Sequence, residues 1–430
     1  MKKTLIILLT ALTACTAKAP LSLQIVNSEM ARCPEASFID GQEGKLKWNY
    51  TTGLELKAFL DVYKMADQVG HDSAKVGHDA AKVGHDAAKV GHDTAKVGHD
   101  TRHSRLDRES ILNYVDSWYD AIIDSVGHIY KYKQSNFSLD HICPGRTLFQ
   151  LYDLSGKEKY RAAMDTLYAQ LLAQPRTPEG GFWHKAIYPE QMWLDGLYMA
   201  QPFYAEYTGR FVADSLERAA NYEDIVHQFQ LVFDATLDSE TGLLRHAWDS
   251  SRQMFWCNPE TGQSAHSWGR AMGWYAMALV DVIPLMPAGE NLDALVQILN
   301  QVFQAIPIFA DATTGMWYQV LDRPYGDGNY LEATASAMFT YAMLKGTRLG
   351  VLEGISRNDA RSRFEELLGT FVTVGEDGLL NLNDCCEVAG LGGKQNRSGD
   401  YDYYINEPVR SNDPKGIGPL IWAALEYEML

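Results

Sequence analysis

The sequence predicts an all-α protein. Apolar residues recur every three or four positions over long stretches, turn-forming residues separate those stretches, and long alternating strand patterns are scarce. A helix with its loop takes about 30 residues, so a chain of 430 residues has room for around a dozen helices. That number suits a closed ring of helical hairpins or an open solenoid. The solenoid is the weaker alternative, because the sequence shows no repeat of about 30 to 45 residues.

The N-terminal segment, residues 1–15, is typical of a lipoprotein signal. Lys2 and Lys3 precede an apolar stretch that is too short to cross a bilayer as a helix. Leu12-Thr13-Ala14-Cys15 then resembles the lipobox of bacterial lipoproteins, in which the cysteine is lipidated and becomes the mature N-terminus. Ordinary cleavage after small residues is the alternative. We expect secretion across the inner membrane and a periplasmic or outer-membrane location, with a lipid on Cys15 as the sole membrane attachment, since no later segment looks apolar enough to span.

The composition narrows the remaining possibilities. Residues 16–430 are apolar enough to bury one large core, so we expect a single domain. The formal net charge of −17 argues against a nucleic-acid partner, whose phosphates require basic patches, but leaves a small anionic substrate open. Five cysteines remain after Cys15, two of them adjacent, which is not a disulfide framework, although one or two bridges stay open. No C-x-x-C pair indicates a structural metal.

A heptad insertion interrupts the chain at about residues 69–103. The unit Val-Gly-His-Asp-Ser-Ala-Lys begins at Val69 and recurs four times with little change. Each unit offers a thin apolar seam and contains a glycine, which costs about 1 kcal/mol relative to alanine inside a helix. Metal binding by the five histidines is disfavoured, because positions seven apart lie roughly 10 Å apart along a helix. We expect a solvated, marginal helix or a disordered segment without a catalytic role.

Three apolar stripes mark the clearest helices. Each repeats with spacings of three and four, the pattern of one helix face. The stripes consist of Tyr160, Met164, Leu167 and Leu171; of Tyr222, Val226, Phe229 and Phe233; and of Leu292, Leu295, Leu299, Val302, Ile306 and Phe309. The turn signals between helices fall at residues 175–181, 238–242, 284–289, 311–315 and 323–329.

Aromatic and acidic residues gather in the connections rather than in these stripes. Four clusters stand out, at residues 48–50, 139–146, 184–197 and 246–274. Flat rings such as those of Trp268 and Trp274 can cover a sugar, and the planar fork of Arg270 suits a carboxylate. Trp193 and Leu197, four apart, look instead like the core face of a helix. This inventory predicts a carbohydrate site.

The same clusters hold candidates for proton transfer. Asp140 and Asp195 are the candidate acids and bases, with His184 and His246 as polar contacts. Each has a structural alternative. Asp140 could cap the helix that follows it, and His246 could be an ordinary surface histidine.

Several motifs in one order resemble the unsaturated rhamnogalacturonyl hydrolases of glycoside hydrolase family 105, which are related to the unsaturated glucuronyl hydrolases of family 88. The resemblance runs from about Trp48 to the C-terminus, and the heptad insertion departs from it. It rests on Trp193-Leu194-Asp195-Gly196-Leu197, on Trp268-x-Arg270-x3-Trp274, on residues 328–333 and on residues 390–392 with Tyr403-Tyr404. It implies an (α/α)6 barrel, a closed ring of six helical hairpins with the site at one end.

The resemblance also implies roles for individual residues. Asp195 resembles the catalytic general acid/base, and Asp140 the second essential carboxylate. The positions that resemble substrate-lining residues are Tyr50, His184, His246, Trp268, Arg270 and Trp274. No metal and no organic cofactor is implied, and the expected partner is an unsaturated uronic-acid oligosaccharide.

The implied reaction hydrates a double bond. Polysaccharide lyases leave a sugar with a C4=C5 bond, and the resemblance implies that Asp195 protonates C4 while water adds at C5. The hemiketal then opens and the glycosidic bond breaks, so the rule relating carboxylate separation to stereochemistry does not apply. Asp195 must hold a proton near neutral pH, which requires a pKa above the ordinary ~3.9. Burial among aromatics and the like charge of Asp140 would act in that direction.

Four functions stay open on the sequence. The first is release of unsaturated galacturonic acid from rhamnogalacturonan fragments. The second is the same reaction on unsaturated glucuronyl groups from ulvan, arabinogalactan or a glycosaminoglycan. The third is a conventional inverting glycosidase, and the fourth is a glycan-binding lipoprotein without activity. Two well-placed carboxylates exceed what binding alone requires, which favours an enzyme. The sequence predicts no oligomeric state.

Overall fold

The computed structural model describes residues 19–65 and 100–430. Cys15 and nearly all of the heptad insertion lie outside these residues. The predictions made for them, lipidation and an insertion without a catalytic role, therefore stay predictions.

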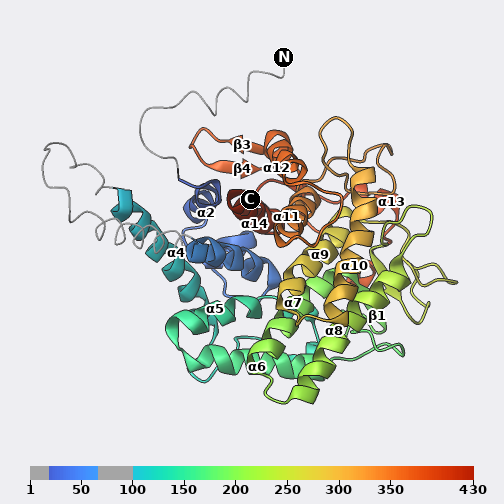
Figure 1. Cartoon of the computed structure of the whole chain (residues 1–430), viewed down its shortest axis with the longest axis horizontal. Coiled ribbons are helices and arrows are strands. Elements are labelled where there is room, and N and C mark those ends of the chain that lie inside the picture. The colour runs from blue at the N-terminus through green and yellow to red at the C-terminus, as the bar shows by residue number, and fades with distance from the viewer. Residues whose placement is uncertain (1–18, 66–99) are drawn as a thin grey trace, which may run out of the picture.

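Long helices of the described residues alternate along the chain between an outer and an inner ring (Figure 1). The outer helices are α2 (Leu21–Arg32), α4 (Asp100–Ile122), α6 (Glu158–Leu172), α8 (Ser215–Thr236), α10 (Glu290–Ala305) and α12 (Arg357–Phe371). The inner helices are residues 50–65, α5 (Gly145–Ser155), α7 (Leu194–Phe211), α9 (Gly269–Val282), α11 (Ala333–Leu349) and α14 (Pro414–Met429). Every residue of α9 is buried, whereas the outer helices bury only one face. The predicted ring of six helical hairpins is confirmed.

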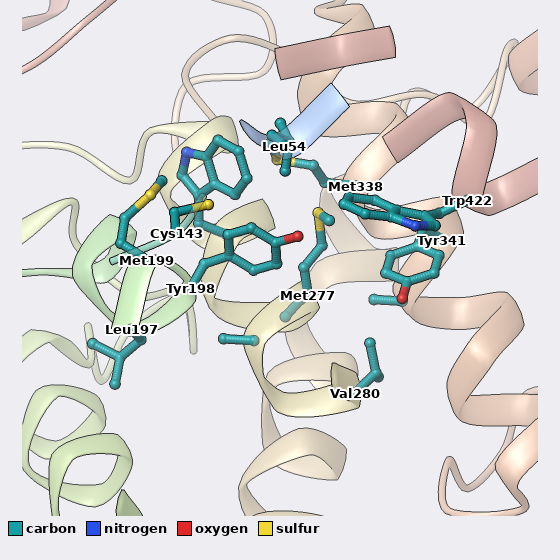
Figure 2. Packing of buried hydrophobic residues seen from close by; sticks show 14 of the residues in the cluster. Leu54, Cys143, Leu197, Tyr198, Met199, Met277, Val280, Met338, Tyr341 and Trp422 are labelled. Carbon is teal, nitrogen blue, oxygen red and sulfur yellow. The ribbon is translucent and has the colours of Figure 1, made fainter. Parts of the chain in front are cut away.

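The ring closes where the first inner helix meets its two neighbours. Gly53 lies so close to Pro144, just before α5, that an added Cβ would sit 2.6 Å from the proline Cα. On the other side, an added Cβ at Gly418 of α14 would be 3.1 Å from Leu54. Side chains from the inner helices fill the space that the ring encloses, among them Leu54, Tyr198 and Met277 (Figure 2). The centre of the barrel is therefore a packed core.

The predicted stripes occupy the buried faces of the outer helices, with one difference. In α6 all four stripe residues are buried, and in α8 and α10 most are. The third stripe was expected to continue as one helix to Phe309, but α10 ends at Ala305 and a short 3₁₀ helix, η6 (Ile306–Phe309), follows. Pro307 accounts for the break, because proline has no N–H to donate to the preceding turn.

Side-chain caps fix the start of several helices. Asp214 accepts hydrogen bonds from the N–H groups of Leu216 and Glu217 at the start of α8. Ser356 and Asp359 form a reciprocal capping box at the start of α12. Such caps satisfy backbone donors that a helix leaves free, and each contributes about 1 kcal/mol.

A buried ionic network joins three inner helices at the end of the barrel opposite the site. Asp281 of α9 accepts hydrogen bonds from Arg146 of α5 at 2.7 Å and from Lys345 of α11 at 2.7 Å. Tyr341 donates to the same carboxylate at 2.5 Å. The network lines a cavity of about 270 Å³ together with residues of helix 50–65 and of α14. One carboxylate thus compensates two cations that are otherwise withdrawn from water.

Short strands tie the loops together at the other end. β1 (Gln191–Trp193) pairs antiparallel with β2 (Ala247–Asp249), so the connection before α7 is joined to the loop between α8 and α9. The expectation that Trp193 shares a helical core face with Leu197 is wrong, because Trp193 is the last residue of β1 and α7 begins after it. Two further strand pairs, β3 (Val372–Val374) with β4 (Leu380–Leu382) and β5 (Cys385–Cys386) with β6 (Val409–Arg410), lie near α12 and α14.

Two expectations from composition can be compared with the structure. The five cysteines after Cys15 are all free thiols. The one or two disulfide bridges that the sequence left possible are therefore not formed. We expected no segment after the N-terminal signal to be apolar enough to span a membrane. Among the described residues, however, one helical segment, Glu290–Phe309, is long and apolar enough by composition to do so. Its α10 portion packs against α8 and α9 as part of the outer ring.

Candidate active site

The predicted site residues converge at the N-terminal ends of the inner helices. Tyr50 begins the first inner helix, Asp195 is the second residue of α7, and Arg270 is the second residue of α9. An α-helix carries partial positive charge at its N-terminus from its unpaired N–H groups. Such ends favour an anionic ligand beside them.

The first carboxylate, Asp140, lies in the short 3₁₀ helix η4 (Leu139–His141). One oxygen is 2.5 Å from Nζ of Lys185, and the other is 3.5 Å from Nε2 of His184. A backbone hydrogen bond from the N–H of Leu139 to the carbonyl of His184 joins the two segments at 3.1 Å. Asp140 does not cap the helix that follows, because the N-cap of α5 is Pro144.

Electrostatics keep this group of residues in defined protonation states. Burial raises the pKa of Asp140 and is the largest single effect, but the charge and hydrogen bond of Lys185 together with the neighbouring histidines outweigh it, so the net pKa is lowered. Burial lowers the pKa of His184 to about 4, against the opposing charge of Asp140. Near neutral pH, Asp140 is therefore an ion-paired carboxylate beside a neutral imidazole.

The second carboxylate, Asp195, faces His246. The Oδ2 atom of Asp195 lies 3.3 Å from Nε2 of His246. The two atoms do not form a hydrogen bond, and both are buried without a hydrogen-bond partner. On the other side of the ring, Nδ1 is 2.7 Å from the hydroxyl of Tyr404. His246 is completely buried, so the alternative of an ordinary surface histidine is wrong.

Aromatic rings hold both histidines in place. Trp193 stacks on His184 with ring centroids 4.7 Å apart and an interplanar angle of 9°. Tyr188 also stacks on Trp193, with ring centroids 4.8 Å apart. The ring of Trp268 lies 4.8 Å from that of His246. The wall of the site is thus a continuous set of rings with the two histidines inserted in it.

Tyr50 lies near enough to both carboxylates to feel their charge. Burial, and after it the charge of Asp140, raise the pKa of Tyr50 well above its ordinary value, and Asp195 acts in the same direction. Tyr50 and Asp140 also line a cleft of about 380 Å³. The charged residues of its wall are the cations Lys47, Arg410 and Lys415 and the carboxylates Asp40, Asp140 and Glu387.

Arg270 and Trp274 are set deeper than the other predicted residues. Arg270 is 1% exposed; it pairs with Glu332 at 3.2 Å and donates to the carbonyl of Cys386. Its Nε has no hydrogen-bond partner among the described residues. The ring of Trp274 packs against Tyr198, with centroids 4.8 Å apart. The proposed contact of these two side chains with substrate stays a prediction.

Two residues of this site were missed by the sequence analysis. Lys185 directly follows His184, and its position next to a candidate polar contact was the only signal for it. Tyr404 stood within a motif that carried the family resemblance, but no role was assigned to it. Both matter because they contact a predicted residue, Asp140 in one case and His246 in the other.

The arrangement can transfer protons on one face of a bound sugar. It offers one carboxylate with a lysine partner and another that faces only a histidine. In the part of the chain that the structure describes, no group of three or more His, Cys, Asp or Glu side chains is arranged to hold a metal ion. The two carboxylates can supply acid–base catalysis.

Known proteins share this fold and much of this sequence. Residues 101–430 match the family model described as Glycosyl Hydrolase Family 88. A solved structure of a Clostridium acetobutylicum glycoside hydrolase from family 105 is 38% identical, with a TM-score of 0.81, and the match covers 96% of this chain and 100% of that one. Protein Atu3128 of Agrobacterium fabrum is 39% identical over 238 residues, which are 54% of this chain and 99% of the relative. The unsaturated rhamnogalacturonyl hydrolase YesR of Bacillus subtilis is 27% identical over 250 residues, 56% of this chain and 66% of the relative.

Proposed function

Because the chain belongs to the glycosidases of families 88 and 105, we propose that it releases a 4,5-unsaturated galacturonic acid from the non-reducing end of rhamnogalacturonan oligosaccharides. The observation that carries the proposal is the contrast between the two carboxylates. Asp140 is ion-paired with Lys185 at 2.5 Å, whereas Asp195 has no lysine or arginine within ion-pair distance among the described residues. Two carboxylates in different surroundings suit two different roles.

In the proposed reaction Asp195 acts first as an acid and then as a base. Its carboxyl proton transfers to C4 of the substrate, so that an O–H bond breaks, a C–H bond forms and positive charge develops at C5. Water adds at C5 and gives a proton back to Asp195. The hemiketal formed in this way opens, and the bond to the next sugar breaks. Asp140, kept ionised by Lys185, stabilises the developing positive charge.

Cationic side chains and helix N-termini in the cleft can hold an anionic substrate. The first residues of helix 50–65 and of α14 lie on its wall, together with Lys47 and Arg410. Lys415 is buried and pairs with Asp413, while Lys47 is exposed and has no ion pair among the described residues. Carboxylates on the same wall offset these charges, so a uronate carboxylate would bind through direct contact with a cation such as Lys47 rather than through the net charge of the cleft.

The choice of polymer rests on the similarity to YesR, the unsaturated rhamnogalacturonyl hydrolase of Bacillus subtilis. The test compares kcat/KM for the unsaturated disaccharide of rhamnogalacturonan with that for unsaturated glucuronyl disaccharides. The proposal expects the first substrate to be preferred. A higher kcat/KM on a glucuronyl disaccharide would support the proposed reaction but show that the substrate comes from a different polymer.

The proposed role of Arg270 predicts a specific kinetic change. Arg270→Lys should raise KM for the unsaturated disaccharide about tenfold or more and change kcat less, because the free Nε donor is lost. Lysine keeps the positive charge beside Glu332, which a change to alanine would leave unpaired in the core. KM and kcat are measured together with the midpoint of thermal unfolding.

The matched control for this variant is Arg357→Lys. Arg357 is exposed at the start of the outer helix α12 and does not line the cleft. Its kinetics should equal those of the wild type. An unchanged KM in Arg270→Lys, with normal folding, would show that Arg270 is structural and that the substrate carboxylate binds elsewhere.

A further inference from the structure

Tyr404 contacts His246 on the side of the ring away from Asp195 and is buried, so it does not contact a substrate itself. It lies in the short helix α13 (Tyr401–Ile405) and is completely buried. Its backbone carbonyl accepts a hydrogen bond from Nε2 of Gln319 at 3.1 Å. The Oε1 of the same glutamine accepts from Nε1 of Trp268 at 3.0 Å, and the Trp268 ring packs beside His246. The hydroxyl of Tyr404 is thus held in a fixed place next to His246.

The hydrogen bond between Tyr404 and His246 has a defined donor and acceptor. Within residues 19–65 and 100–430, Nδ1 of His246, at 2.7 Å, is the sole hydrogen-bond partner of the Tyr404 hydroxyl. Burial raises the pKa of Tyr404 well above its ordinary value, so the O–H stays intact. If Nδ1 carried a proton and donated, the buried O–H would have no acceptor, which costs about 1 to 3 kcal/mol. Tyr404 therefore donates, and Nδ1 accepts.

The proton of the neutral His246 ring then resides on Nε2. A neutral imidazole carries its proton on one nitrogen, and the hydrogen bond at the other selects which. Nε2 is the atom that faces Oδ2 of Asp195 at 3.3 Å. A small rotation of the Asp195 carboxyl group turns this contact into a hydrogen bond from Nε2–H to Oδ2.

The two oxygens of Asp195 are consequently not equivalent. Oδ2 is buried against His246, whereas the side chain as a whole keeps 15% of its surface exposed. Oδ1 has no hydrogen-bond partner among the described residues and is the oxygen that stays accessible. When Oδ2 accepts from Nε2–H, the carboxyl proton is placed on Oδ1, where a substrate can receive it.

We propose that Tyr404 is a positioning residue of this enzyme, which acts through His246 to keep the transferable proton of Asp195 on Oδ1. The inference rests on the proposed function, in which Asp195 protonates C4. In that step the Oδ1–H bond breaks and the C4–H bond forms, and water later returns a proton to Oδ1 as it adds at C5. His246 keeps its proton on Nε2 throughout and gains none.

Other charged groups near His246 leave this assignment in place. His184 lies across Trp193 from it and stays neutral, since burial lowers its pKa to about 4. Asp322 and Arg397 act on Tyr404 with opposite signs and less strongly than burial. Neither makes a hydrogen bond to the Tyr404 hydroxyl or to the His246 ring.

The kinetic test replaces one hydroxyl. Tyr404→Phe should lower kcat about fivefold or more and leave KM within about twofold, because it removes the hydrogen bond that selects the tautomer without touching the cleft. Tyr403→Phe is the matched control, with the same chemical change one residue earlier in α13; its hydroxyl accepts from the N–H of Gly390 and donates to Glu407, and neither bond involves His246. That control should keep kcat within about twofold. Equal kcat values for Tyr404→Phe and the wild type would overturn the proposal.

A second readout tests the tautomer without any turnover. In protein labelled with ¹⁵N-histidine, the His246 ring should show a protonated Nε2 and a bare Nδ1, and the signal is assigned by its loss in His246→Gln. In Tyr404→Phe the ring should move towards a mixture of both tautomers. A proton on Nδ1 in the wild type would contradict the proposal. If instead the tautomer is as expected and no unsaturated sugar is turned over, the proposed function fails while the hydrogen-bond assignment stands.

Discussion

Asp195→Asn should fold like the wild-type protein and lose turnover of unsaturated oligosaccharides by about a hundred- to ten-thousandfold. The amide has nearly the same shape as the carboxyl group and can still accept from His246, so the second residue of α7 keeps its place. It cannot give a proton to C4 or take one from water. The loss should appear in kcat, with KM little changed, because the missing step occurs after binding.

The control for this variant makes the same change in the first turn of another helix. Asp293 lies in the first turn of the outer helix α10, where it is exposed and has no ion pair within the part of the chain that the structure describes. Asp293→Asn should therefore keep the wild-type kcat. Activity close to that of the wild type in Asp195→Asn would remove Asp195 from the catalytic role, whatever the family resemblance implies.

Asp281→Ala should destabilise the barrel by about 3 to 5 kcal/mol. The change leaves Arg146 and Lys345 buried next to each other without their shared carboxylate, and it removes the acceptor of the Tyr341 hydroxyl. Denaturant unfolding followed by circular dichroism gives the difference. Glu366→Ala is the control, since Glu366 pairs with Arg363 on the surface of α12 and should contribute less than about 1 kcal/mol. A loss for Asp281→Ala as small as that of the control would contradict the assigned role of the network.

The same carboxylate predicts how stability depends on pH. Burial raises the pKa of Asp281, but Lys345 and Arg146 outweigh burial and lower it below its ordinary value. A group with a lowered pKa in the folded state stabilises the protein above its unfolded-state pKa of about 3.9 and loses that contribution as the pH falls further. The wild type should therefore lose stability more steeply than Asp281→Ala below about pH 4.

Much of the fold was predictable, because it depends on local patterns. Spacings of three and four marked the buried faces of α6, α8 and α10, and the turn signals marked their ends. The errors arose where a local pattern had two explanations. Trp193 stands four residues before Leu197, as in a helix, yet pairing with β2 keeps it extended. The stripe of α10 continues past Ala305 because Pro307 interrupts the helix but not the apolar spacing.

The site was predictable in its residue types but not in its pairings. Four residues were recognised because they lie in connections or at the start of a helix, away from the apolar stripes: Asp140, Asp195, His184 and His246. Which partner each one has depends on contacts between distant segments. Tyr404 reaches His246 across 158 positions in the chain, and only the closed ring brings the two together. No spacing rule within one segment contains that information.

The most direct measurement follows two products of one reaction. Purified protein is mixed with lyase-generated unsaturated rhamnogalacturonan disaccharide, and the ultraviolet absorbance of the conjugated double bond is recorded while the released neighbouring sugar is measured in the same samples. Hydration predicts that absorbance falls in step with release, one double bond lost for each sugar freed. Release of the sugar while the absorbance persists would show direct attack at the anomeric carbon, and stable absorbance without release across all unsaturated disaccharides would contradict the proposed activity.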